Sequence, residues 1–240
     1  MVATTTTQPP DAVQRVEPLL VPLSLLTLVT GLVDAACYLG LGRVFTANMT
    51  GNIVLLGFGA ARAQGLPVLA PVVSLAVFLI GAAAGGRLAT SMAGPAGTTV
   101  SEPVRRRWVT VALGAEVVLV AAAAVVAIGL PVGDGGVRRY VVIGLLAAGL
   151  GLQNATVRRL AVPDISTTVL TMTLTGLAAD SRLGGGHSPR VGRRVTAVGL
   201  IAAGALLGAL LLRVDVALPV LVAAVVIALA AAALRFESIS

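Results

Sequence analysis

The sequence predicts an all-α membrane protein, a polytopic helical bundle with six full spans, two short polar-laced helical segments and a two-half internal repeat. Composition is the first reason: 57% of the residues are hydrophobic and 11% are charged, whereas soluble domains have roughly 45–50% and about 25%. The mean hydropathy is +1.00. The apolar residues also fall into blocks about as long as the roughly 20 helical residues that cross a bilayer.

Six apolar blocks are long enough to be membrane spans. They are residues 19–41, 67–90, 108–130, 140–157, 195–212 and 214–234. We therefore expect one transmembrane domain over residues 19–234. Residues 1–18 are polar and rich in Thr, so we expect a disordered cytoplasmic tail there, and residues 235–240 form a second cytoplasmic tail.

Two further blocks, residues 45–61 and 165–179, are apolar but laced with polar side chains. Eight spans result if both blocks cross the membrane, seven if one does, and six if both are broken or re-entrant. All 17 basic residues are arginine, and eight spans divide them nine to eight between the two sides, whereas six spans divide them twelve to five. Because short cytoplasmic loops collect positive charge, we predict six full spans with both termini in the cytoplasm.

The chain also resembles itself at two places. Residues 30–35 (TGLVDA) resemble 149–155 (GLGLQNA), and residues 81–85 (GAAAG) resemble 204–208 (GALLG). The first pair sets Asp34 against Asn154, 120 positions later, and the second pair has an offset of 123. We interpret this pattern as a duplication with halves at about 19–130 and 138–234, which six spans would place in opposite orientations.

Polar side chains inside spans are candidates for function, because a charged group at the centre of a bilayer costs about 2.5–3.5 kcal/mol on insertion scales. Asp34 lies inside the first block, one helical turn before Tyr38, and both are candidates for binding a substrate or ion. Glu116 is a weaker candidate. It lies about two turns into the block that begins at Trp108, where water and headgroups can still reach it.

The polar-laced blocks supply most of the other candidates for a substrate- or ion-binding site, and we expect the two blocks to face each other near the centre. Asn48 and Asn52 would share a helix face, and Gly51 would let the backbone bend or unwind between them. Backbone groups freed in this way can bind a solute where they line a cavity. The candidates in this group are Asn48, Thr50, Gly51, Asn52, Thr167, Thr171 and Thr175. Packing between helices is the alternative role for all of them.

Gln153 and Asn154 complete the set of candidates. They lie near the end of their span, beside Arg158 and Arg159, and would cap that helix or face the same cavity.

At these residues the sequence is similar to a known family. The strings GLVDAACYLGLGRVFTANMTGNIVLLG and GLGLQNATVRRLAVPDISTTVLTMTLTGLA resemble the YoaK-like family of bacterial multi-pass membrane proteins, a domain of unknown function. The resemblance covers nearly the whole chain beyond its N-terminal tail, with a departure at Thr171-Met172, where a second Thr-Gly pair is expected. It implies a location in the bacterial cytoplasmic (inner) membrane and brings no established activity.

These features favour a transporter or channel for an unknown small solute, with a polar site between two repeat halves. The alternative is a non-catalytic scaffold or assembly factor whose GxxxG faces, residues 81–85 and 204–208, hold partner helices or a second copy of the chain. We expect no enzyme, cofactor or metal, because His187 and Cys37 are the sole histidine and cysteine. The arginines lie at the ends of apolar blocks, which indicates a lipid bilayer rather than nucleic acid as the partner.

Overall fold

In the computed structural model, the described residues are 17–63, 68–133, 136–160, 170–181, 185–186 and 191–236. Their regular secondary structure is entirely α-helical. The helices are α2 (Glu17–Gly40), α3 (Met49–Ala60), α4 (Leu69–Ala93), α5 (Glu102–Ala127), α6 (Val137–Leu160), α7 (Leu170–Ala179), α8 (Val191–Leu211) and α9 (Ala217–Phe236). The predicted tails lie outside the described residues except for residues 17, 18, 235 and 236, which are helical.

Within the described residues, six helices are long and apolar enough to cross a membrane: α2, α4, α5, α6, α8 and α9. The helices α3 and α7 have 12 and 10 residues. They are about 18 and 15 Å long, which is too short for a hydrocarbon core of about 30 Å. The prediction of six long and two short apolar helices is therefore confirmed.

Each long helix extends beyond one or both ends of the apolar block that predicts it, and α5 shows why. It begins at Glu102 rather than at Trp108, with Pro103 in its first turn. A proline there loses no hydrogen bond, because the first N–H groups of a helix have no partner within the helix. The carboxylate of Glu102 forms an ion pair with Arg105. Hydropathy marks only the apolar part of such a helix, so it misses a polar first turn.

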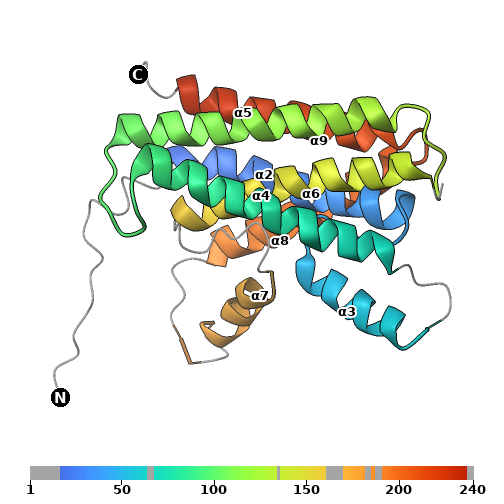
Figure 1. The fold of residues 1–240 in the computed structure, drawn as a ribbon. Coiled ribbons are helices and arrows are strands. Elements are labelled where there is room, and N and C mark those ends of the chain that lie inside the picture. Colours follow the sequence, from blue (N-terminus) through green and yellow to red (C-terminus); the bar gives the residue numbers. More distant parts are fainter. Residues whose placement is uncertain are drawn as a thin grey trace.

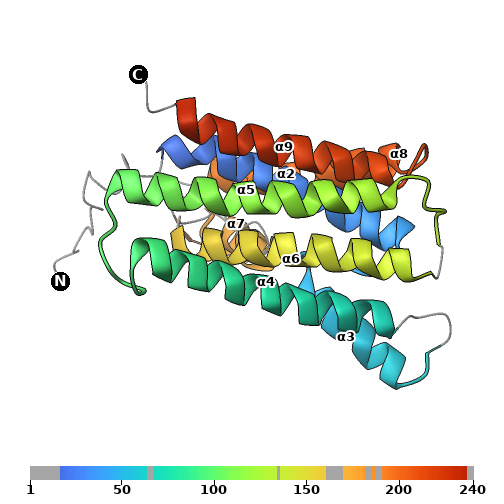
Figure 2. The same ribbon diagram turned by 45° about the horizontal axis from the view of Figure 1, so that its top comes forward.

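The long helices pack in pairs that join the two halves of the chain. The helix α4 lies against α6, and α8 lies against α2, while α5 packs on both α6 and α9 and α2 also packs on α9. Figure 2 shows α4 beside α6, and α5 running between α6 and α9. Each long helix of the first half therefore has a close neighbour in the second half.

Glycines permit the close approach of α4 and α6. A Cβ atom added to Gly81 would overlap the carbonyl oxygen of Ala148, and one added to Gly151 would overlap that of Phe78. The two backbones are thus in direct contact, as in small-residue packing of membrane helices.

The contact between α2 and α8 has the same form. A Cβ atom added to Gly204 would overlap the carbonyl oxygen of Leu28, and one added to Gly31 would overlap that of Ile201. On α2, Gly31 and Leu28 lie 120 positions before Gly151 and Ala148 of α6. On α8, Gly204 and Ile201 lie 123 positions after Gly81 and Phe78 of α4. These are the offsets at which the sequence resembles itself.

Both GxxxG stretches are consequently covered within one chain. Gly85 faces Ala155 on α6, and Gly208 faces Ala35 on α2. This occupancy removes the two faces as the contact for the predicted homo-oligomer.

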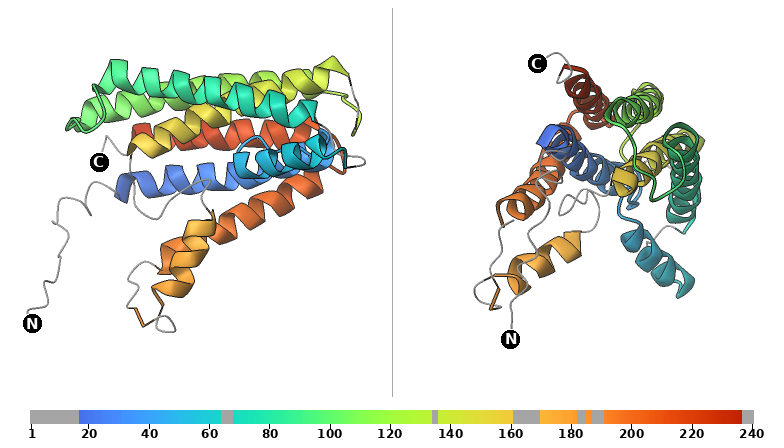
Figure 3. Two further views of the ribbon diagram at one scale, coloured as in Figure 1. Left: turned by 60° about the horizontal axis from the view of Figure 1, so that its bottom comes forward. Right: turned by 90° about the vertical axis from the view of Figure 1, so that its left-hand side faces the viewer.

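The short helices lie outside the bundle of long ones. The helix α3 packs on α4 and α7 packs on α8, and the end-on view in Figure 3 shows both projecting from one side, apart from each other. The expectation that they face each other at the centre is therefore wrong. Figure 1 shows that α2 ends and α4 begins at one end of the bundle, so the segment containing α3 leaves and returns at that end.

Candidate functional site

A hydrogen-bonded connection, residues 41–48, joins α2 to α3 and contains several predicted site residues. The Oδ1 atom of Asp34 accepts hydrogen bonds from the backbone N–H groups of Thr46 (2.8 Å) and Ala47 (2.9 Å). Its Oδ2 atom accepts a third from the N–H of Asn48 at 3.2 Å. Successive N–H groups that converge in this way form an anion-binding turn, and here the anion is the carboxylate of the chain itself.

Two more side chains hold the same connection through the backbone of Phe45. The side chain of Asn52, fully buried, accepts from the Phe45 N–H at 2.9 Å and donates to the Phe45 carbonyl at 2.7 Å. The hydroxyl of Ser74 on α4 donates to the same carbonyl at 2.6 Å. The helices α2, α3 and α4 thus each contribute one polar side chain that fixes the 41–48 connection.

The neighbouring candidates have roles other than those the sequence suggested. Asn48 is the N-cap of α3, where its Oδ1 atom accepts from the N–H of Gly51 at 3.2 Å. Asn48 is exposed and Asn52 is buried, so they do not share a face. A Cβ atom on Gly51 would lie 2.7 Å from the Phe45 ring, so this glycine makes room for the ring rather than breaking the helix. The Tyr38 ring stacks on the Phe45 ring with centroids 4.9 Å apart.

The threonine candidates lie at the surface wherever the structure describes them. Thr50, Thr171 and Thr175 are exposed, whereas Thr173, which the sequence analysis did not select, is buried. Thr167 lies outside the described residues. The exposed face of α7 is therefore the one that carries the predicted threonines.

A second set of polar side chains lies in the centre of the bundle. Glu116 on α5 is fully buried, and Gln153 on α6 is 1% exposed. Within the described part of the chain, both carboxyl oxygens of Glu116 and both side-chain amide atoms of Gln153 lack a hydrogen-bond partner. Most buried polar groups in proteins are paired, and leaving one unpaired costs about 1–3 kcal/mol. These two side chains are thus unlike Asp34 and Asn52, whose polar atoms are bonded.

Glu116 and Gln153 belong to one interface between α5 and α6. A Cβ atom added to Gly149 would lie 3.6 Å from the Cγ atom of Glu116. On α6, Gln153 lies one turn after Gly149. It lines a cavity together with Leu113 of α5, which lies about one turn before Glu116. The two polar side chains therefore follow each other along this interface at a separation of about one helical turn.

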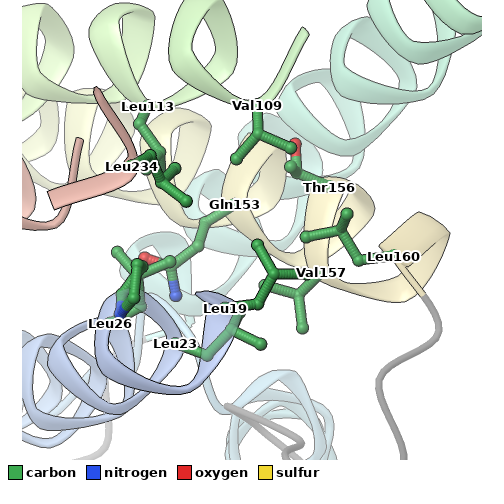
Figure 4. Close-up of a pocket in the computed structure, with 11 residues that line it drawn as sticks. Leu19, Leu23, Leu26, Val109, Leu113, Gln153, Thr156, Val157, Leu160 and Leu234 are labelled. Carbon is green, nitrogen blue, oxygen red and sulfur yellow. The ribbon is translucent and has the colours of Figure 1, made fainter. Parts of the chain in front are cut away.

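The cavity beside Gln153 is formed by helices from both halves of the chain, α2 and α5 from the first and α6 and α9 from the second. Its lining residues are Leu19, Pro22, Leu23, Leu26, Val109, Leu113, Gln153, Thr156, Val157, Leu160 and Leu234. Figure 4 shows Gln153 reaching from α6 toward α2, where Leu23 and Leu26 face it. Thr156 satisfies its own hydroxyl by donating to the carbonyl of Leu152 at 2.9 Å. Gln153 is thus the lining residue whose polar side chain has no partner among the described residues.

Glu116 lies about two turns after Trp108, as the sequence indicates, and about four turns after the start of α5 at Glu102. Its side chain is fully buried among the helices. One expectation from the sequence needs correction here. Asn154 does not cap α6, because that helix continues to Leu160. Its side-chain amide instead donates to the carbonyl of Leu150 at 2.8 Å.

The sequence analysis also missed two residues that take part in these sites. Ser74 is buried in α4 and holds the 41–48 connection. The sequence could have indicated Ser74, because it is an isolated hydroxyl in the first half of an apolar span. Thr46, whose backbone and hydroxyl both donate to Asp34, carries no such signal, because its role depends on how the chain turns after α2.

Comparisons with known proteins give a family and one similar transmembrane protein. A family model described as "Protein of unknown function (DUF1275)" matches residues 23–234. The chain is also similar to "UPF0700 transmembrane protein YoaK" of Bacillus subtilis (strain 168), with 38% identity over 158 residues, which cover 66% of this chain and 65% of that relative. The match thus spans slightly less than two thirds of the relative's length. No solved structure matches the chain.

Proposed function

The chain belongs to the DUF1275 family of proteins of unknown function, as its motifs predicted, and from its own geometry we propose that this multi-pass membrane protein transports a small polar solute across the bacterial cytoplasmic membrane. One observation carries the proposal. Two buried polar side chains, Glu116 and Gln153, lack partners among the described residues and lie along an interface that adjoins a cavity. The cavity has room for little more than one water molecule in this conformation. A ligand whose donor and acceptor groups supply what these side chains lack therefore reaches them only after the helices move apart.

The proposal includes an inverted repeat, with halves at about 19–130 and 138–234. It is supported by the glycine contacts, which recur at offsets of 120 and 123 positions between the α4–α6 pair and the α8–α2 pair. The packing also matches between the halves. In the bundle α6 packs on α4 and α5, and α2 packs on α8 and α9, which are the corresponding helices of the other half. Transporters built from inverted repeats bind their substrates at the interface of the repeats, and the cavity is lined by α2, α5, α6 and α9.

The Asp34 region supports this function indirectly. Its carboxylate accepts three backbone N–H groups, so it is already paired, whereas Glu116 is not. We assign Asp34 to holding the 41–48 connection and α3 beside the bundle. Asp34, Asn48 and Asn52 then shape one mouth of the transporter rather than bind its solute.

We place both termini in the cytoplasm. The end of the bundle where α2 begins and α6 ends carries Arg105, Arg106, Arg107, Arg158 and Arg159. Positive charge collects on the cytoplasmic side of bacterial membrane proteins. The cavity beside Gln153 is lined by Leu19 and Leu160, which lie close to this end, so we assign it to the cytoplasmic side of the pathway.

The scaffold alternative requires GxxxG faces that are free to bind partner helices. Gly81, Gly85, Gly204 and Gly208 already contact other helices of the same chain. A transporter needs such internal contacts between its halves, whereas a scaffold would leave them open for partners. We likewise propose that the protein is not an enzyme and needs no cofactor.

Intracellular metabolites test the transport proposal. A deletion strain should differ from its parent in the level of at least one small polar metabolite, and the wild-type gene should restore that level. Gln153→Leu keeps the volume of the side chain but removes its amide, so we expect about tenfold less transport, the equivalent of one lost polar interaction of about 1.4 kcal/mol. Thr171→Val is the matched control, because it removes a polar group from an exposed position. Full restoration by Gln153→Leu protein that accumulates normally would remove Gln153 from the solute site, and a deletion strain with unchanged metabolites would contradict transport.

A further inference from the structure

We propose that Glu116 takes up and releases a proton inside the membrane, so that the solute movement proposed above is coupled to H⁺. This inference rests on the proposed transport function and names its coupling ion. It starts from the position of the carboxyl group, which is fully buried against Gly149 about midway along α5.

The first argument is the lack of any group that would hold Glu116 as a permanent anion. No hydrogen-bond donor in the described residues reaches either of its oxygens. An ionised carboxylate in a low-dielectric interior without a partner carries a desolvation penalty of several kcal/mol, whereas the protonated acid is neutral. The resting form in this conformation is therefore the acid, and the anion requires a change that brings water, a cation or a donor to it.

The second argument concerns the charged and titratable groups on the helices packed against α5. They are Arg87 on α4, Arg138, Arg139, Tyr140, Arg158 and Arg159 on α6, Arg235 on α9, and Glu102, Arg105, Arg106 and Arg107 on α5 itself. The nearest of these along α5, Arg107, is nine residues away, or about 13 Å. Those on α6 lie in its first and last turns. On α2, which also lines the cavity, Asp34 is bonded to the 41–48 connection, Cys37 is buried beside Thr46, and Tyr38 stacks on Phe45. Among the described residues of α5 and α6, Glu116 is thus the ionisable group near the middle of their interface.

The third argument is a polar route from Glu116 toward the arginine-rich end. Gln153 follows about one turn along the interface, and Thr156 comes about one further turn along, at the lining of the same cavity. An amide and a hydroxyl can each hold water by hydrogen bonds, and hydrated polar side chains carry protons in membrane transporters. The leucines around the route keep the carboxyl group out of contact with bulk water until the halves move.

A carbodiimide that partitions into membranes tests this inference on the wild-type chain. Dicyclohexylcarbodiimide reacts with the protonated carboxylic acid: the O–H group adds across one C=N bond, and the acyl group then shifts to nitrogen, so that all atoms stay in a stable N-acylurea. The full chain, reconstituted in liposomes, is treated from about pH 5 to about pH 9. Mass spectrometry of the digested protein locates the label.

We expect labelling at Glu116 that falls at least about tenfold as the pH rises through this range, as a group that exchanges its proton with water should. Asp34→Asn should leave that labelling unchanged, and Glu116→Gln should abolish it. Absence of label at Glu116, or a level that does not depend on pH, would overturn the inference.

The outcome separates this inference from the transport proposal. If Gln153→Leu fails to restore metabolites but Glu116→Gln restores them fully, transport stands and proton coupling is wrong. If Gln153→Leu restores them and Glu116 still shows pH-dependent labelling, the proton site stands and the assignment of the solute site is wrong.

Discussion

Asp34 and Glu116 look alike in the sequence, since each is an acidic side chain inside an apolar span, yet their surroundings differ. The oxygens of Asp34 accept N–H groups from three successive residues. Those of Glu116 have no partner among the described residues. A carboxylate with several charge-assisted hydrogen bonds is a stable structural element, whereas an unpaired buried one is retained at a cost to stability. We therefore propose a structural role for Asp34 and a functional one for Glu116.

Asp34→Asn tests the structural role. The asparagine oxygen can keep the bonds from Thr46 and Ala47, but its NH₂ group would face the N–H of Asn48, and two donors repel each other. We expect the free energy of unfolding to fall by about 1.5–3 kcal/mol, the usual contribution of a hydrogen bond to a charged group. The thermal midpoint of the detergent-purified protein measures this, with Thr50→Ala as an exposed control. A midpoint equal to that of the wild type would return Asp34 to the list of binding candidates.

Pairs of helices, rather than single helices, determine how the spans assemble. The α4–α6 and α2–α8 contacts each bring two backbones together at glycines. Burial of apolar area supplies little driving force in lipid, so close packing at small residues has to stabilise these pairs. A methyl group at such a position should therefore be enough to separate them.

Gly204→Ala tests the α2–α8 pair, because the new Cβ atom would overlap the Leu28 carbonyl oxygen. We expect it to lower stability by about 1–3 kcal/mol, as overpacking does in cores. Gly199→Ala is the matched control on the same helix, since nothing lies within 4 Å of its added Cβ. Accumulation in the membrane and the thermal midpoint report both variants. Equal behaviour of the two would show that the pair tolerates a wider separation.

At the scale of the whole molecule, the six long helices place the start of α2 and the end of α9 on the same side. Both α2 and α9 have their terminal ends at one end of the bundle (Figure 1). The end of α2 and the start of α4 lie at one end of the bundle, and the end of α6 and the start of α8 lie at the other (Figure 1), so we propose that neither α3 nor α7 adds a crossing. The twelve-to-five distribution of arginine supports our proposal that both termini are cytoplasmic.

Cysteine labelling tests this topology. In a Cys37→Ser background, Ala63→Cys should react with an impermeant thiol reagent added outside intact cells, because residue 63 is exposed just after α3. Ser101→Cys, just before α5 at the opposite end of the bundle, should react only after the cells are opened. Labelling of Ser101→Cys in intact cells would require the opposite orientation or a different number of spans.

Much of this fold could be predicted from the sequence alone, because a membrane span is identified by residues that are neighbours along the chain. Hydropathy over about 20 residues located all six long helices, and the polar interruptions separated out the two short ones. The internal offsets of 120 and 123 were also readable, because the glycines at the helix crossings are fixed by sterics. The family followed from motifs around Asp34, Asn52 and Asn154.

Only the tertiary structure decided which polar side chains are satisfied. Asp34 is bonded by residues 12 to 14 positions later, and Asn52 is bonded to Ser74, 22 positions away. Glu116 packs against α6 at Gly149, a residue with no side chain that could form a hydrogen bond. Helix formation depends on neighbours along the chain, whereas a hydrogen-bond partner or its absence depends on residues that come close only after the helices pack. For this reason the sequence named the polar candidates, and the packed bundle separated those that hold the structure from those left without a partner.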